Sequence, residues 1–198
     1  MITSIKIKHI EHFPIDGFTI DKITKKNIFI GKNGFGKTTL FKAIRKWVVE
    51  QNRDEISIFF SEAFMESPKH VYFTLPEELD GRAIQKDINP SDSKTFMAKT
   101  VKSMQMSEMS SGQEQRDILS MFKSDAIYDG CIWFIDEPEK SLDVVEFDKF
   151  IKYLLTSDIQ VFINTHSPTL LNDNRFNRII LDADYYEKIH KIFKKVGK

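Results

Sequence analysis

The stretch Gly31-Lys32-Asn33-Gly34-Phe35-Gly36-Lys37-Thr38 matches the phosphate-binding loop pattern G-x-x-x-x-G-K-[ST] at every fixed position. Glycines let backbone N–H groups surround phosphate oxygens, Lys37 brings positive charge to the β- and γ-phosphates, and the Thr38 hydroxyl can ligate Mg²⁺. The pattern requires a strand before the loop and a helix after it. The apolar run at residues 27–30 predicts the strand, and the helix is predicted by the spacing of Leu40, Phe41, Ile44, Trp47 and Val48. We therefore predict a nucleotide-binding loop.

The run Phe134-Ile135-Asp136-Glu137 is an apolar strand that ends in two carboxylates. Adjacent carboxylates repel one another, so stability alone does not explain the pair. A Mg²⁺ ion does: Asp136 can hold the metal directly or through water, and Glu137 can polarise the water that attacks a γ-phosphate. The alternative is an acidic strand end or helix cap, and the phosphate-binding loop in the same chain makes it the weaker interpretation.

Short apolar strands alternate with helical patterns along the chain. Strands are expected at residues 5–8, 27–30, 56–60, 71–75, 131–135, 160–164 and near 179–181. This alternation predicts an α/β protein with a mostly parallel sheet covered by helices on both faces, and ligands then bind at the carboxyl ends of the strands. The 198 residues are the size of one domain, so a single domain is expected over residues 1–198.

Three more segments lie in a characteristic order. Ser110-Ser111-Gly112-Gln113 resembles the Leu-Ser-Gly-Gly-Gln signature of ABC ATPases, although alone it would indicate only a helix cap. Asp136-Glu137-Pro138-Glu139-Lys140-Ser141-Leu142-Asp143 is similar to the Walker B and D-loop segment of that family, and Asn164-Thr165-His166-Ser167-Pro168 resembles its switch region. Together with the phosphate-binding loop, these motifs make the chain resemble an ABC-type ATPase over residues 31–168.

The resemblance implies a P-loop NTPase fold of the ABC-ATPase head type, with an N-terminal antiparallel β part and a reduced helical and signature subregion at about residues 50–125. It implies ATP and Mg²⁺ bound between two subunits that pack head to tail, the loop of one facing the signature of the other. The catalytic residues would be Glu137 and His166, which senses the γ-phosphate. The metal ligands would be Thr38 and Asp136. The nucleotide-binding residues would be Asn33, Gly34, Phe35, Gly36, Lys37, Thr38, Thr39, Ser110, Ser111, Gly112, Gln113 and, across the interface, Asp143.

The chain departs from the family pattern at a few points. Ser111 replaces the first glycine of the signature and adds a side chain beside the phosphate. The Q-loop glutamine is not assigned, because neither Gln51 nor Gln85 follows a convincing strand. Phe13 and Phe18 are candidates for stacking on the adenine base, but core packing is the better interpretation of both.

The first strand, the Ile-Gly-x-Asn-Gly form of the loop and the Asn-Thr-His-Ser-Pro segment resemble the RecF/SMC and OLD-like branch of this family. The leading hypothesis is thus a soluble ABC-type ATPase that dimerises around ATP. It would switch a separate effector in DNA repair, DNA maintenance or anti-phage defence, and DNA is a possible ligand under this hypothesis. One alternative is the ATP-binding subunit of a transporter with separate membrane subunits. The other is a non-hydrolysing ATP sensor, against which Glu137 and His166 argue.

The composition limits the partners. The 29 basic and 29 acidic residues cancel, so no global field draws the chain to nucleic acid or to an anionic membrane. The single cysteine, Cys131, lies in an apolar run and is expected to be a buried, inert thiol. No apolar stretch reaches the length of a transmembrane helix, and the opening residues lack a signal-peptide pattern, so we expect a cytoplasmic protein.

Overall fold

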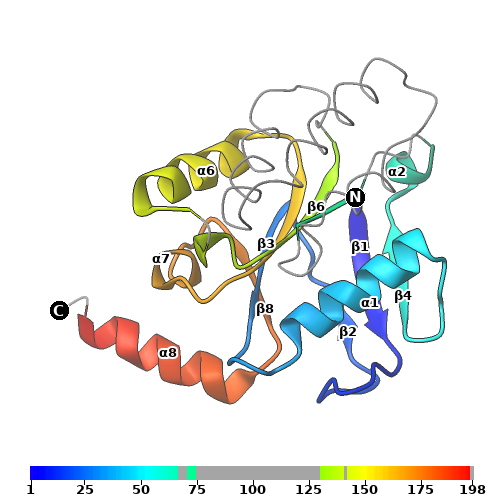
Figure 1. Cartoon of the computed structure of the whole chain (residues 1–198), viewed down its shortest axis with the longest axis horizontal. Helices are drawn as coiled ribbons and strands as arrows, with labels where there is room; N and C mark the ends of the chain where they lie inside the picture. The colour runs from blue at the N-terminus through cyan, green and yellow to red at the C-terminus, as the bar shows by residue number, and fades with distance from the viewer. Residues whose placement is uncertain (67–70, 75–129, 141, 197–198) are drawn as a thin grey trace, which may run out of the picture.

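The computed structural model describes residues 1–66, 71–74, 130–140 and 142–196, and Figure 1 shows how they are arranged. The strands are β1 (Ile2–Ile7), β2 (Thr19–Ile20), β3 (Lys26–Ile30), β4 (Ile56–Phe60), β5 (Val71–Thr74), β6 (Ile132–Asp136), β7 (Gln160–Asn164) and β8 (Asn177–Ile180). The helices are α1 (Lys37–Val49), α2 (Glu62–Glu66), the 3-10 helix η2 (Pro138–Lys140), α6 (Val144–Thr156), α7 (Pro168–Leu171) and α8 (Ala183–Val196). The predicted signature at 110–113, Gln85 and Ser141 lie outside the described residues.

The central sheet has the strand order β5-β6-β7-β3-β8, and all four neighbouring pairs are parallel. This confirms the predicted α/β class with a parallel sheet. Because parallel strands end at a common edge, three predicted motifs meet there. The loop follows β3, Asp136 is the last residue of β6, and the switch segment begins at the end of β7. The sequence order of the motifs thus becomes a single site in space.

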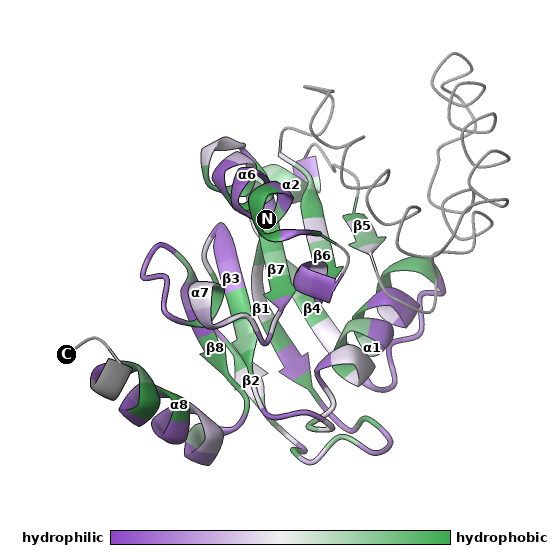
Figure 2. Ribbon diagram, turned by 60° about the vertical axis from the view of Figure 1, so that its left-hand side comes forward, coloured by the Kyte–Doolittle hydropathy of each residue, from purple (hydrophilic) through white to green (hydrophobic). Residues whose placement is uncertain are grey.

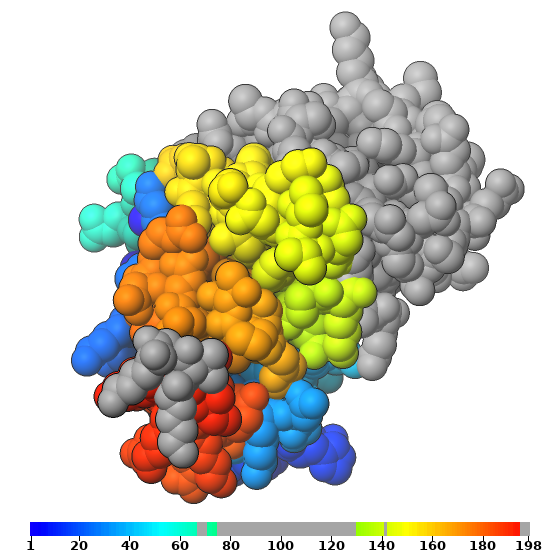
Figure 3. All heavy atoms as spheres, turned by 90° about the vertical axis from the view of Figure 1, so that its left-hand side faces the viewer, coloured from blue at the N-terminus to red at the C-terminus, as the bar shows by residue number. Residues whose placement is uncertain are grey.

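Both faces of this sheet are buried, and the alternation of side chains along each strand separates two cores. In β6, Trp133 and Ile135 belong to a core with residues of α6 and α7, whereas Ile132 and Phe134 belong to a core with residues of α1 and the antiparallel sheet. Figure 2 shows the apolar strands running between helices with polar outer faces, and Figure 3 shows α6, α7 and α8 following one another down one face. The predicted burial of Cys131 is confirmed.

A row of phenylalanines crosses four strands on the α1 side of the sheet. Phe73 stacks on Phe134 and Phe134 on Phe162, with ring centroids 5.0 and 4.7 Å apart. Phe41 of α1 meets this row edge to face, with its ring centroid 5.4 Å from that of Phe29 and 5.2 Å from that of Phe134. Edge-to-face pairs add directional stabilisation to the burial of the rings. The row therefore fixes the helix that follows the phosphate-binding loop.

The N-terminal antiparallel part is the three-stranded sheet β2-β1-β4. Gln160 of β7 joins it to the parallel sheet, because its side chain accepts from Ile2 N at 2.6 Å and donates to Ile2 O at 2.8 Å. Within the range 50–125, β4 belongs to this sheet and β5 to the parallel sheet. Among the described residues, no helix is both long enough and apolar enough to span a membrane.

Candidate nucleotide-binding site

The loop between β3 and α1 depends on two glycines with left-handed backbone. Gly34 has a φ of 74° and Gly36, the N-cap of α1, a φ of 90°. A Cβ at Gly36 would lie 2.7 Å from Cδ2 of Phe13, closer than carbon atoms can approach. The first turn of α1 carries no acidic residue, so nothing on the helix itself neutralises its positive N-terminal end. The geometry is that of an anion-binding loop.

Lys37 is 7% exposed and its Nζ lies at the centre of the loop. It donates to Gly31 O at 2.7 Å and to Lys32 O at 3.2 Å, and it lies 2.9 Å from Nε2 of His166. Burial lowers the pKa of Lys37, while the carboxylates of Glu137 and Asp136 act in the opposite direction. An ammonium group that is held but poorly solvated is suited to receive phosphate oxygens.

Thr38 and Asp136 meet at the metal position that the sequence predicts. Thr38 Oγ1 donates to Asp136 Oδ2 at 2.7 Å, and Asp136 is 1% exposed. Its Oδ1 is buried and accepts no hydrogen bond from the described residues. Burial raises the pKa of Asp136, and the neighbouring side chains of Thr38 and Asn164 oppose this rise. A buried carboxylate oxygen without a donor, beside a hydroxyl, fits a cation such as Mg²⁺.

No group of three or more His, Cys, Asp or Glu side chains in the described ranges could hold a metal by itself. A magnesium ion here would take Thr38 and Asp136 from the protein and its other ligands from phosphates and water, the usual way in which Mg²⁺ accompanies a nucleotide.

Glu137 follows with a strained backbone, a φ of 47°, and its N–H donates to Asn164 O at 2.9 Å. Left-handed backbone at a non-glycine residue costs energy and persists where neighbours enforce it. The side chain forms an ion pair with Lys140, and its Oε1 lies 3.8 Å from His166 Nε2. Lys140 was not predicted as a site residue. It lies three residues after Glu137, and the contact arises because the 3-10 helix η2 turns back toward the strand end.

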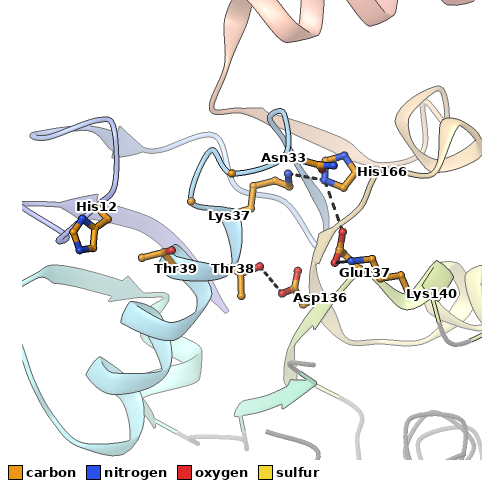
Figure 4. A pocket seen from close by; sticks show the side chains of 11 residues that line it. His12, Asn33, Lys37, Thr38, Thr39, Asp136, Glu137, Lys140 and His166 are labelled. Atoms are coloured by element: carbon orange, nitrogen blue, oxygen red, sulfur yellow. Dashed lines mark hydrogen bonds and ion pairs between the residues drawn. The ribbon is translucent and has the colours of Figure 1, made fainter. Parts of the chain in front are cut away.

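His166 lies between Lys37 and Glu137, as Figure 4 shows. Burial lowers the pKa of His166, and the positive charge of Lys37 lowers it further. A lysine ammonium can only donate, so Nε2 must be the acceptor and the ring proton resides on Nδ1. The switch histidine therefore lies in reach of both the loop lysine and the predicted general base.

These side chains enclose a cleft of about 430 Å³. It is lined by His12, Asn33, Gly34, Gly36, Lys37, Thr38, Thr39, Asp136, Glu137, Lys140 and His166.

Phe35, which the sequence predicts as a nucleotide-binding residue, is half-buried and packs against the core on the α1 side. Phe13 is buried and Phe18 packs on the same core, as the core-packing interpretation predicts. His12 reaches the cleft instead, from a backbone φ of 63°, and no sequence signal marks it.

Asp143 has a local role in the structure. Its Oδ1 accepts from Val145 N and Glu146 N, both at 2.9 Å, so it caps α6. It does not line the cleft. Its predicted role across a subunit interface stays a prediction, as do the roles of Ser110, Ser111, Gly112 and Gln113, which lie outside the described residues.

The parallel sheet, the phosphate-binding loop after β3 and the carboxylate at the end of β6 together define the P-loop NTPase class. Among solved structures, an ATP-binding cassette of an ABC transporter in its ADP conformation is similar to the chain with a TM-score of 0.54, at 16% identity and with 100% of both chains covered. The predicted ABC-cassette fold is thereby confirmed.

Two further similar structures are also transport proteins. One, a metal-chelate type ABC transporter in an inward-facing conformation, has a TM-score of 0.51 at 16% identity, over 92% of this chain and 80% of the other. The second, a cobalt transport ATP-binding protein, has a TM-score of 0.51 at 18% identity, over 89% of this chain and 76% of the other. No protein-family profile and no curated protein sequence matches the chain.

Proposed function

We propose that this chain is an ABC-type ATPase that binds Mg-ATP in the cleft and hydrolyses it. The observation that carries the proposal is the convergence of Lys37, the Thr38–Asp136 pair, Glu137 and His166 on one cleft at the carboxyl edge of the sheet. The residues come from three separate strand ends, and each has the chemistry that phosphoryl transfer from a nucleotide requires.

The loop would hold the phosphates through its N–H groups, through Lys37 and through the N-terminal end of α1. Thr38 and Asp136 would hold Mg²⁺, which would supply positive charge that stabilises the charge on the phosphates. Glu137 would accept a proton from the attacking water, and His166 would contact the γ-phosphate. In this mechanism Glu137 would exchange its contact with Lys140 for water, and Lys37 would exchange its contact with His166 for phosphate oxygens.

ATP would also bind at the interface between two copies of the chain and stabilise the dimer, and Ser110–Gln113 of one copy would complete the site of the other. On the resemblance to the RecF/SMC and OLD-like branch, the switch would control a separate effector in DNA maintenance or anti-phage defence. A second candidate, the ATP-binding subunit of a transporter, is favoured by the transport proteins among the similar structures.

The experiment is the light-scattering mass of the Glu137→Gln protein with and without Mg-ATP, beside the turnover of the wild type. The substitution keeps binding but removes the general base, so the ATP-bound state accumulates. We expect the mass to double from 23.1 kDa, and Ser110→Arg to prevent the doubling.

The other outcomes are informative. Binding without a change of mass would contradict the homodimer and direct the search to a different partner chain. Binding without turnover in the wild type would indicate a sensor, and absence of ATP binding would exclude the whole proposal. Fractionation with membranes would favour the transporter candidate over the DNA-linked effector, and stimulation of turnover by DNA would favour the reverse.

A further inference from the structure

Glu139 lies just outside the cleft, in η2, two residues beyond the predicted general base. One of its carboxylate oxygens, Oε1, accepts three hydrogen bonds from a single segment. The donors are Thr165 Oγ1 at 2.9 Å, His166 N at 2.6 Å and Ser167 N at 3.1 Å. Neither a strand end nor a surface acid needs such a concentration of donors on one atom.

The segment that Glu139 holds is the one that carries His166. Its first residue, Thr165, is 1% exposed, and its hydroxyl also accepts from Ser167 N at 2.9 Å, so the turn is closed on itself as well as on the carboxylate. The second oxygen, Oε2, is buried and has no hydrogen-bond partner among the described residues, so the side chain is fixed through Oε1 alone. Bonds from N–H and O–H groups to a carboxylate are the stronger class of hydrogen bond.

These bonds link two strand ends that are adjacent in the sheet, since η2 follows β6 and the held segment follows β7. The same two segments are also joined nearer to their strands, where Glu137 N donates to Asn164 O at 2.9 Å. The segment of the predicted general base and the segment of the histidine are thus joined at two places, and the turn held in this way carries the imidazole that lies 2.9 Å from Lys37 Nζ.

We propose that Glu139 is a positioning residue, which holds the 165–167 turn so that the His166 imidazole faces Lys37 and the γ-phosphate position. The proposal rests on the proposed ATPase function for its effect on turnover, but its effect on His166 does not depend on that function. A shift of a catalytic group by about 1 Å can cost two orders of magnitude in rate, so loss of this clamp should reduce kcat more than binding.

The test compares Glu139→Ala with Glu139→Gln, whose amide oxygen can still accept the three bonds. In Glu139→Ala we expect kcat to fall about 10- to 100-fold while the Kd of Mg-ATP stays within about threefold. Glu139→Gln should retain most of the activity. Thr165→Val removes one donor and should lie between them, with Thr165→Ser as its conservative partner and Glu187→Ala as the control for a surface carboxylate.

The second readout is the ¹⁵N spectrum of the histidine rings in the empty protein. The chain has five histidines, and His166→Ala identifies the signal of His166. We expect an acceptor Nε2 and a protonated Nδ1 in the wild type and in Glu139→Gln, and tautomer averaging in Glu139→Ala. If Glu139→Ala does not fold, Glu139→Gln and Thr165→Val carry the test.

A wild-type His166 signal together with unchanged kcat in Glu139→Ala would overturn the proposal. So would a Glu139→Gln protein that behaves like Glu139→Ala, because the acceptor atom would then not be what holds the turn. If the wild type has no turnover, the ATPase function fails, and the ring spectrum still decides whether Glu139 positions His166.

Discussion

Nζ of Lys37 and Nε2 of His166 lie 2.9 Å apart, although 129 positions separate the two residues in the chain. Burial lowers the pKa of both groups, so the folded structure disfavours the positively charged form of each. Only a neutral imidazole can accept a hydrogen bond from the lysine ammonium, so this contact ties the protonation state of His166 to the geometry of the loop.

The first prediction concerns pH. The pKa of His166 is below its ordinary value of 6.5 in the folded chain, so below pH 6.5 the unfolded chain binds more protons and the free energy of unfolding falls. The free energy of unfolding, measured with urea, should be lower at pH 5.5 than at pH 7.5. In His166→Asn this difference should be smaller by about 1 kcal/mol. An equal loss in both proteins would mean that His166 titrates normally.

The second prediction is that Asp136→Asn stabilises the empty protein and abolishes its response to magnesium. Burial raises the pKa of Asp136, which means that the charged form is disfavoured in the folded state at neutral pH. Removing that charge should raise the free energy of unfolding by about 1 kcal/mol at pH 7.5, with the gain shrinking as pH falls toward the ordinary value of 3.8. Thermal unfolding with and without Mg-ATP measures both effects, and destabilisation of the empty variant would contradict the prediction.

The third prediction separates two glycines of the loop. Both have left-handed backbone, which costs an alanine about 1 kcal/mol, but only at Gly36 would the added Cβ also meet Phe13. Gly36→Ala should therefore destabilise the protein more than Gly34→Ala, whose Cβ meets nothing within 4 Å. Chemical denaturation of the two variants, and of Gly36→Ala combined with Phe13→Ala, tests this. If Gly36→Ala costs as much stability in the Phe13→Ala background as in the wild type, the ring is not the obstacle.

The fourth prediction separates the capping role of Asp143 from its predicted role at an interface. Asp143→Ala should cost about 1 kcal/mol of stability through loss of the α6 cap, whereas Asp143→Ser should keep most of it. If Asp143 also crosses to a second subunit, both substitutions should weaken ATP-driven dimerisation in the Glu137→Gln background. Equal dimerisation in Asp143→Ser and its parent would leave capping as the role of this residue.

The fifth prediction concerns recognition of the adenine base of the nucleotide. His12 lines the cleft from the side away from Asp136 and Glu137, as seen in Figure 4, so it is where a base would lie if the phosphates occupy the loop. His12→Ala should weaken ATP binding by about 10-fold, the effect of losing one stacked ring, and leave inorganic triphosphate binding unchanged. Calorimetric titration with both ligands decides it. Equal losses would show that His12 acts on the phosphates instead.

Sequence patterns predict elements whose signal is local. The strands Gln160–Asn164 and Ile56–Phe60 have the predicted bounds, because the apolar residues that indicate each strand lie within it. The last strand begins at Asn177 and not near 179, because its polar first residues pair with β3 and the Asn177 amide donates to Lys22 O at 2.6 Å. Hydropathy does not register such backbone pairing.

In the site, too, residues marked by a local motif are predicted and contacts between distant residues are not. Lys37 and Thr38 belong to one contiguous loop, and Asp136 ends one strand, so a motif is enough to find them. The contact of Glu139 with the His166 turn joins residues 27 positions apart, and it exists only because β6 and β7 are neighbours in the sheet. Strand order is not part of a local sequence pattern, so the contact of Glu139 with the His166 turn is not predicted.

Three pairs of side chains line the cleft: Lys37 with His166, Thr38 with Asp136, and Glu137 with Lys140. Any ligand that enters must compete with bonds that the protein makes with itself, and its measured affinity is the difference between the two sets. A triphosphate with its metal would bring partners for all three pairs, whereas a ligand with a single charge would not, so we expect these contacts to favour ligands that carry several charges.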